Sequence, residues 1–316
     1  MIRNSQNILM LNDRIIYNFR YRAPLISLLC DKGHNVEGIG VYDRGALLPL
    51  LALRLLIGRH DLVLCSNLKS NVFALLFSRR PKVIILNGFG RFRGNARIRA
   101  IVRFLLGFWK NTFAIVQNYA DYRYLRRYCP HVQMEWLPGS GGVVKTTGHA
   151  RTVVTVQRDD KISAVAGNII ALLSQMQPCP KLAVVGCENR KQLDQLFAGI
   201  PFRASGYVDA SDIFREGGTF LQPMGYGEGF PHTLADAIVS GMDVYISDIE
   251  FLRYGLSRLS AHRTTLAPGW SRLISSAELI SAVHATTIAA RTVQICETFY
   301  QDSKMISLND NSGSAG

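Results

Sequence analysis

The sequence predicts an α/β protein with two domains, each built on a parallel, doubly wound β-sheet. Short apolar runs of strand length alternate with segments of helical character along the chain. Such alternation is typical of parallel sheets that are covered by helices on both faces. The length of 316 residues accommodates two domains of ordinary size, and a glycine-rich stretch near the middle of the chain can connect them.

The apolar runs define the expected strands. In the first half they cover residues 7–11, 35–42, 61–66, 82–88 and 113–118, and in the second half 152–157, 181–186, 202–208, 217–224 and 243–248. Residues 21–34 are expected to form a helix that ends near Gly33, and 277–300 a second one. The segment PGSGGVVKTTGHA (138–150) connects the halves. We therefore expect a first domain over 1–147, a second over 148–305 and a disordered tail over 306–316.

Composition argues against several classes of protein. The longest apolar candidate, residues 46–58, contains Arg54 and is shorter than the ~18 residues that suggest a membrane span. The first twenty residues show no signal-peptide core or cleavage site, so secretion is not expected. The six cysteines lack paired spacing: Cys30, Cys65, Cys129, Cys179, Cys187 and Cys296. This pattern indicates reduced thiols in the cytoplasm rather than a disulfide framework or a zinc site.

Positive charge is concentrated in the first half of the chain. Residues 1–150 contain 22 Lys and Arg against 7 Asp and Glu, a balance of +15, and since the whole chain carries +13, residues 151–316 carry −2. A basic half indicates an anionic partner, for which nucleic acid and an anionic membrane both qualify. No RNA-binding aromatic motif or helix-turn-helix pattern is present, so nucleic acid is not the expected partner.

The segment RIRAIVRFLLGFWK (97–110) is a candidate for membrane contact. One helical stripe carries Ile98, Ile101, Val102, Leu105, Phe108 and Trp109, and another face carries Arg99, Arg103 and Lys110. The pattern fits an interfacial helix on anionic lipid, and it fits equally a helix packed on the sheet with a basic outer face. Nearby arginines favour the membrane, because each cation near an anionic surface adds about 1 kcal/mol. They are Arg91, Arg93, Arg97, Arg123, Arg126 and Arg127.

The stretch YGEGFPHTLADAI (226–238) carries the main functional signal. It follows a predicted strand, and Pro231 suits the first turn of a helix that would continue to Gly241. Glycines at 225, 227 and 229 allow the backbone to approach a ligand closely. A strand-to-helix loop of this kind presents backbone amides to an anion.

Two acids, Glu228 and Asp236, stand eight residues apart in this stretch. At about 1.5 Å per residue they would be separated by roughly 12 Å, so they could address two parts of one ligand with phosphates between them. Local chemistry leaves open an ordinary turn with solvated acids, although the apolar neighbours of Asp236 indicate partial shielding. His232 could approach a phosphate or a sugar, and a merely solvated histidine is the alternative.

Residues 228–248, EGFPHTLADAIVSGMDVYISD, resemble the signature of retaining GT-B glycosyltransferases of the group 1 (GT4-like) family. That signature is a Glu, seven residues, a second Glu, then Ala-x-x-x-Gly and a strand ending in Asp; here Asp236 replaces the second Glu. The resemblance implies two Rossmann-like domains facing a central cleft. It implies that Glu228 contacts the donor sugar and Asp236 the nucleotide ribose. The other implied donor-binding residues are Gly227, Gly229, Phe230, Pro231 and His232.

Weaker similarities follow in the family's order through the first half. Residues 19–39 resemble the first helix and strand of members that elongate lipid-linked glycans, and 87–94 their Gly-x-Gly loop. Residues 113–128 and 138–143 resemble the strand, helix and linker entry that follow. The implied acceptor-side residues are Arg22, Ser66, Lys69, Asn87, Gly88 and Gly90. The sequence departs from the family at Ser66, which stands near a family histidine, and in lacking a glycine-rich first loop.

Arg158 and Lys161 are the candidates for the family's basic pair, with a shorter spacing than usual and two acids between them. They would stabilise the charge that builds on a departing diphosphate, and a solvated charged turn is the alternative. No Asp-x-Asp, HExxH or paired-cysteine motif is present, so we expect neither a metal nor a cofactor. Cations and helix amides would then balance the diphosphate charge.

The resemblance implies a retaining transferase that moves a sugar from a nucleotide-diphosphate sugar to a glycan or lipid-linked acceptor in cell-surface polysaccharide synthesis. The expected location is the cytoplasm, with the basic half docked peripherally on the cytoplasmic face of the membrane. Two alternatives remain open. One is a GT-B sugar-nucleotide epimerase, and the other is a non-catalytic membrane-binding or sugar-binding module.

Overall fold

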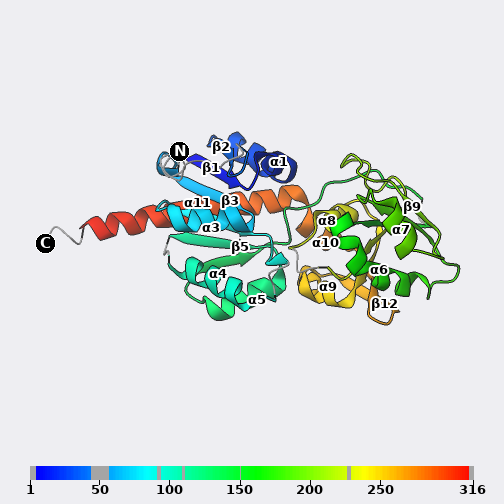
Figure 1. Ribbon diagram of the computed structural model, residues 1–316. Helices are drawn as coiled ribbons and strands as arrows, with labels where there is room; N and C mark the ends of the chain where they lie inside the picture. Colours follow the sequence, from blue (N-terminus) through cyan, green and yellow to red (C-terminus); the bar gives the residue numbers. More distant parts are fainter. Residues whose placement is uncertain are drawn as a thin grey trace. The chain divides into compact units, whose positions relative to one another are not determined.

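The computed structural model describes residues 5–43, 57–90, 94–108, 111–149, 151–225 and 229–312, with side chains as far as residue 305. The chain divides into two compact units. The first comprises 1–140 and 285–316 together with 227–229, and the second comprises 141–226 and 230–284. Each unit contains one β-sheet with helices packed on it (Figure 1).

The first unit has a six-stranded, fully parallel sheet in the order β2-β1-β3-β4-β5-β6. Its strands are β1 (Asn7–Asn12), β2 (Asn35–Gly40), β3 (Leu62–Ser66), β4 (Lys82–Leu86), β5 (Thr112–Val116) and β6 (Gln133–Trp136). The strands β3 and β4 are buried along their whole length, as expected where helices cover both faces. The winding direction reverses between β1 and β3, and in open α/β sheets ligands bind beyond the carboxyl ends of strands at such a point.

The helices of the first unit include one from the end of the chain. They are α1 (Ile15–Asp31), α3 (Leu68–Phe77), α4 (Ala96–Phe108), α5 (Tyr119–Tyr128) and α11 (Ala285–Ser312). Figure 1 shows α11, in orange to red, running along the first sheet. Its apolar side chains join the core formed by β1, β3, β4 and α1, and Phe299 packs against Phe113 with ring centroids 5.7 Å apart.

This division differs from the predicted domains 1–147 and 148–305. The boundary between the units falls between residues 140 and 141 of the sequence, and residues 285–305 belong to the first unit. The helical segment expected over 277–300 is interrupted at His284, whose backbone is extended (φ −71°, ψ 141°), and α11 begins after it. The tail expected to be disordered from residue 306 continues α11 as far as Ser312.

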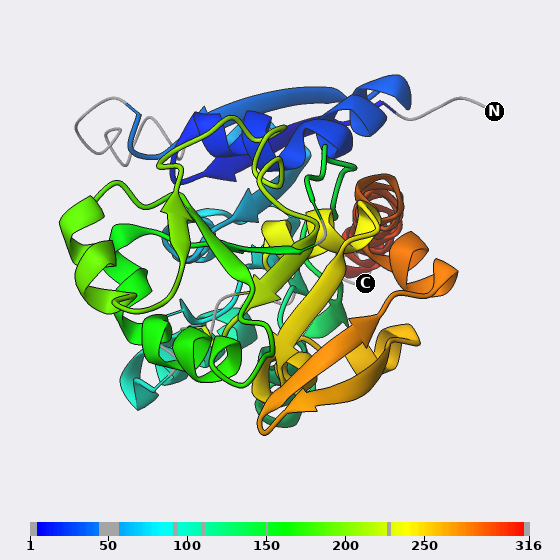
Figure 2. The same ribbon diagram turned by 90° about the vertical axis from the view of Figure 1, so that its right-hand side faces the viewer.

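The second unit has a seven-stranded mixed sheet in the order β12-β13-β11-β10-β7-β8-β9. Its strands are β7 (Thr152–Val156), β8 (Lys181–Val185), β9 (Phe202–Ala204), β10 (Thr219–Gln222), β11 (Asp243–Ser247), β12 (His262–Ala267) and β13 (Trp270–Ile274). The first five are parallel, as predicted, whereas β12 and β13 form an unpredicted antiparallel hairpin on the edge. Figure 2 views this sheet, with its strands coloured green to orange.

The helices of the second unit are α6 (Asp159–Leu173), α7 (Arg190–Leu196), α8 (His232–Val239), α9 (Asp248–Arg253), the 3-10 turn η2 (Leu256–Leu259) and α10 (Ala277–Val283). The sheet separates two apolar clusters, one beneath α8, α9 and α10 and the other beneath α6 and α7. The winding direction reverses between the neighbouring strands β7 and β10. Helices α6 and α8, which follow these two strands, therefore begin at the switch point of the sheet.

Candidate functional site

Helices α6 and α8 begin without a side-chain cap. Arg158 stands at the N-cap of α6 and Pro231 at that of α8, and neither side chain accepts a hydrogen bond from the first turn. By contrast, Asn189, Ser247 and Ser276 cap α7, α9 and α10 with their side chains. First-turn amides carry partial positive charge, so the starts of α6 and α8 can receive an oxyanion at the switch point.

Both predicted cations lie at the start of α6. The guanidinium of Arg158 pairs with Asp160 at 3.1 Å, and these side chains are 56% and 62% exposed. A pair this exposed contributes at most about 1 kcal/mol, so Arg158 can exchange Asp160 for a phosphate at little cost. Lys161 lies partly buried in the first turn. Between them, Asp159 accepts the backbone amides of Glu188 and Asn189, each at 3.1 Å, and thereby holds the loop before α7.

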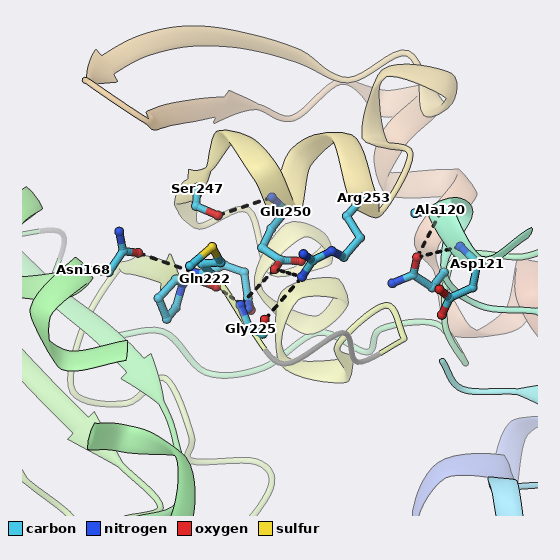
Figure 3. Close-up of polar contacts among 11 residues, drawn as sticks. Ala120, Asp121, Asn168, Gln222, Gly225, Ser247, Glu250 and Arg253 are labelled. Carbon is cyan, nitrogen blue, oxygen red and sulfur yellow. Dashed lines mark hydrogen bonds and ion pairs between the residues drawn. The ribbon is translucent and has the colours of Figure 1, made fainter. Parts of the chain in front are cut away.

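The loop that leads from β10 towards α8 is fixed at its base by a buried ion pair (Figure 3). The amide of Gly225 donates to Glu250 Oε1 at 2.9 Å. Arg253 donates to the same carboxylate and, at 3.3 Å, to the carbonyl of Gly225. Glu250 is fully buried and Arg253 is 16% exposed. The amide of Met224 also contacts Asn168 of α6 at 3.5 Å, so the loop is tied to α6 and α9 together.

Sequence reasoning missed Glu250 and Arg253, although one signal for them was present. Ser247 and Glu250 match the spacing of a capping box, in which the Glu side chain returns to the N-cap amide. Ser247 does cap α9, accepting from the amide of Glu250 at 3.3 Å. The carboxylate of Glu250 also binds Gly225 and Arg253, contacts that the capping-box spacing does not predict.

The motif residues have different environments. Glu228 and Gly227 lie outside the described residues. Gly229 and Phe230 are buried, and the Phe230 ring packs against Tyr254 in the core, with centroids 5.5 Å apart. The contact with the sugar donor that was predicted for Phe230 could therefore be made only by the main chain of this residue. Pro231 and His232 are half-buried, and Pro231 is the N-cap residue rather than part of the first turn, with φ at −65°.

Asp236 has a backbone partner that the sequence did not reveal. Its Oδ1 accepts the amide of Val143 at 2.8 Å, and Ser240 accepts that of Lys145 at 2.8 Å. The stretch expected to be a plain connection is thus fastened to α8. At Gly142 the fit is so close that a Cβ would lie 2.3 Å from the carbonyl carbon of Ala235, which only glycine avoids.

The pKa of Asp236 is raised, because burial disfavours its charge more than the Val143 amide and Lys145 favour it. A raised folded-state pKa means that the ionised carboxylate destabilises the fold above that pKa, and that this cost disappears as pH falls through it. Asp236→Asn keeps an oxygen for Val143 and removes the charge. We expect a higher melting temperature for this variant at pH 7 to 8 and a smaller difference towards acid pH, measured by thermal unfolding across pH. A variant that is less stable at neutral pH would contradict this assignment.

A second polar cluster lies at the carboxyl ends of β1, β3 and β4 in the first unit. Asn12 donates to Asn18 and to Ser66, at 2.9 Å in both cases. Asn67 donates to Asn12 at 2.5 Å and accepts from Asn87 at 2.7 Å. The cluster is a continuous chain of amide hydrogen bonds across three neighbouring strands.

The structure brings three of the predicted acceptor-side residues into this cluster. Ser66 and Asn87 are members, and Arg22 of α1 donates to Asn87 Oδ1 at 3.3 Å. Gly88 and Gly90 follow Asn87 with φ of 108° and 54°, values that favour glycine. Lys69 stands apart from them: it is exposed, and its ammonium lies 5.0 Å from the centroid of the Tyr42 ring.

Helix α4 divides the predicted apolar stripe between the core and solvent. Val102 and Leu105 lie in the core, which matches the alternative of a helix packed on the sheet. The apolar side chains that reach solvent are Ile101, Phe104 and Phe108, which are 54%, 68% and 62% exposed. Arg99 and Arg103 lie over the rings of Tyr124 and Tyr128, at 5.1 and 4.6 Å. Trp109, Lys110, Arg91 and Arg93 lie outside the described residues.

The described residues contain neither a membrane-spanning helix nor a cluster of metal ligands. None of the helices, so far as they are described, is long and apolar enough to cross a membrane. Within the same ranges, His, Cys, Asp and Glu nowhere gather in threes as metal ligands would. All six cysteines are free thiols.

Comparison with known proteins gives matches only among solved structures. No protein-family model and no curated protein matches the chain. Anabaena HepE in complex with UDP is 15% identical, with a TM-score of 0.58 over 95% of this chain and 99% of that one. A Listeria monocytogenes protein designated a UDP-N-acetylglucosamine 2-epimerase is 10% identical, with a TM-score of 0.56 over 94% and 97%. The GtfA/B complex is 14% identical, with a TM-score of 0.54 over 81% and 61%. At these identities the likeness shows the fold, and with the two Rossmann-like units it establishes that the chain has the GT-B fold.

Proposed function

We propose that the protein is a retaining glycosyltransferase that uses a nucleotide-diphosphate sugar. One observation carries the proposal: α6 and α8 start without side-chain caps at the switch point of the second sheet. Two cations stand at the start of α6, and in the sequence the start of α8 lies between the motif acids Glu228 and Asp236. A diphosphate fits such a pair of helix starts, since each presents backbone amides and positive dipole charge.

In this proposal the donor spans the motif. Glu228 holds the sugar, Asp236 the ribose, and Arg158 and Lys161 with the amides of α8 bind the diphosphate, without a metal. The raised pKa of Asp236 supports a ligand-binding role, because a buried carboxylate costs stability where an asparagine would serve Val143 equally well. The second oxygen of Asp236 would face the ribose.

Retention requires the acceptor oxygen to bond to the anomeric carbon on the face from which the phosphate leaves. As the bond from that carbon to the phosphate oxygen breaks, the acceptor hydroxyl gives its proton to a phosphate oxygen. The chain's own part is to stabilise the charge that develops on the diphosphate, the task assigned to Arg158 and Lys161. Removing one well-placed donor of this kind typically costs about 10²–10³ in turnover.

The neighbouring structures support both a transferase and an epimerase. HepE was solved with UDP and with UDP-glucose, whereas the Listeria protein is designated an epimerase and covers the chain equally well. The acid pair favours the transferase. Incubation with UDP-sugars in the absence of acceptor separates the two, with products followed by NMR: a transferase releases free sugar and UDP slowly, and an epimerase yields a second UDP-sugar. Formation of an epimeric UDP-sugar would contradict the proposal, and so would the absence of any donor binding.

We also propose that the acceptor is a glycan or lipid-linked saccharide of cell-surface polysaccharide synthesis, reached from the cytoplasmic face of the membrane. Support comes from the exposed apolar triad Ile101, Phe104 and Phe108 and from the exposed arginines of the adjacent helix α5. The first unit remains strongly basic when the segment that contains α11 is counted with it, because residues 285–316 carry two cations and three acids. Apolar side chains beside cations suit an anionic lipid surface.

Flotation with anionic vesicles tests this membrane contact. Phe104→Ser with Phe108→Ser should lower the vesicle partition constant at least about tenfold, since burying each Phe is worth about 1.5–3 kcal/mol. Arg123→Glu with Arg126→Glu should lower it at low salt and have little effect near 1 M, where the Debye length is about 3 Å. Phe19→Ser is the matched control, because Phe19 is 61% exposed on α1. Equal binding of all variants would exclude α4 and α5 as the contact.

A further inference from the structure

Arg22 is a buried cation for which the first unit provides no anionic partner among the residues described. Its side chain is 5% exposed. It donates to two neutral oxygens, Oδ1 of Asn87 at 3.3 Å and Oγ of Ser140. Burial lowers the pKa of Arg22 to about 10, so the guanidinium remains charged at neutral pH. A buried charge without a counter-charge is costly, and such groups are normally paired.

In the part of the chain that the structure describes, the hydrogen-bond partners of Arg22 are polar but uncharged. Ser140 also accepts from Gln117 at 3.2 Å, and Asn87 connects to Asn67. Neutral amides and hydroxyls can orient a guanidinium and an incoming oxyanion together, but they cannot neutralise either one. The residues described in this cluster therefore supply no negative charge to balance Arg22.

The position of the cluster is that of a ligand site. Its members follow β1, β3, β4 and β5, and the switch point of the first sheet lies between β1 and β3. Asn67 has φ 76° and ψ 147°, a backbone conformation that is rare for any residue except glycine and that concentrates at functional sites. The amides of Asn12 and Asn87 hold it there.

The cluster is also accessible. Asn67, Asn87 and Ser140 are partly exposed, and so is Gly88, so the edge of the cluster lies at solvent while Arg22 lies behind it. The two oxygens that orient the guanidinium, on Asn87 and Ser140, therefore belong to residues that are partly exposed to solvent.

We propose that Arg22 is the counter-charge for an oxyanion, a phosphate or carboxylate group, carried by the ligand of the first unit. Resting on the proposed function, this means that the acceptor is an acidic molecule, with either a phosphoryl group or a sugar carboxylate near the hydroxyl that receives the sugar. Arg22 binds that group by paired N–H donors, and Asn87 and Ser140 position the guanidinium.

Isothermal titration tests the proposal with inorganic pyrophosphate and with glucuronate as probes. The full chain is first saturated with UDP, so that the donor site is occupied and only a second anion site remains to be filled. We expect wild type to bind one probe or both, which distinguishes phosphoryl from carboxyl recognition. Arg22→Met should weaken that binding at least about tenfold, and Arg22→Lys should restore part of it, since a point charge lacks the paired donors.

Two further variants make the result specific. Arg20→Met is the matched control, since Arg20 is exposed on the same helix, and it should bind the probes as wild type does. Gln117→Glu places a carboxylate next to Ser140, whose hydroxyl can donate to it and still accept from Arg22. This built-in anion should weaken probe binding about tenfold without lowering the melting temperature, which keeps the test valid even if Arg22→Met fails to fold.

Equal probe affinity for wild type and Gln117→Glu, or the absence of binding of either probe to the UDP-loaded wild type, would overturn the inference while leaving the glycosyltransferase proposal intact. If neither UDP nor another nucleoside diphosphate binds, the proposed function fails, and the same titration without a nucleotide still decides the role of Arg22.

Discussion

Replacing Glu228 with glutamine should lower donor turnover at least about 100-fold and leave the affinity for free nucleotide diphosphate within about threefold of wild type. In the proposed complex the carboxylate acts on the sugar and the nucleotide is held elsewhere. An amide of the same shape retains contact with the sugar but loses the charge. Turnover is measured by UDP release, and affinity by titration with UDP.

The control for this experiment is Glu188→Gln, which alters an exposed acid that lies outside the motif. Its turnover and affinity should match those of wild type. A Glu228→Gln protein with full activity would remove Glu228 from the reaction. A parallel loss of turnover and UDP affinity would place it on the nucleotide instead.

Glu250→Ala should lower the melting temperature of the second unit by roughly 6–20 °C, because losing one partner of a buried ion pair costs about 3–5 kcal/mol. The change removes the carboxylate that pairs with the largely buried Arg253 and that accepts the amide of Gly225. Since the same carboxylate holds the base of the loop before residue 226, affinity for UDP should fall as well. Both effects would follow from one missing side chain.

Two further variants show whether the pair itself is responsible. Removing both partners in Glu250→Ala with Arg253→Ala should recover part of the stability, because no buried charge is then left unpaired. Asp194→Ala breaks the pair with Arg190, whose side chains are 57% and 54% exposed, and should cost no more than about 0.5 kcal/mol. If Glu250→Ala and Asp194→Ala had the same melting temperature, the ion pair between Glu250 and Arg253 would not be what holds the loop.

Much of the fold could be predicted because buried parallel strands appear in the amino-acid sequence as continuous apolar runs. The exceptions have a physical cause. The strand β12 is exposed over most of its length and carries polar residues, so it has no apolar signature, and β6 is short and only partly buried. The periodicity of α11 predicted a helix correctly. It could not reveal that the helix packs on the first sheet, because that depends on long-range contacts such as the one between Phe113 and Phe299.

The candidate site was predictable where its residues are neighbours in the chain. The start of α8 and the cations at the start of α6 belong to local strand-to-helix patterns. The bond between Asp236 and Val143 spans 93 positions, and no local pattern predicts it. The asparagines of the first unit each look like turn residues after a strand, and only the parallel sheet brings them to one edge around Arg22.

The most direct test of the central claim is hydrogen exchange of the full chain with and without saturating UDP. We expect slower exchange at the starts of α6 and α8, over residues 157–163 and 229–236, because phosphate oxygens would accept hydrogen bonds from the first-turn amides. The pattern should be weakened in Arg158→Gln and unchanged in Arg190→Gln, an exposed arginine at the start of α7. Protection confined to the first unit, or no protection by UDP at any segment, would contradict a nucleotide-sugar site at the switch point of the second sheet.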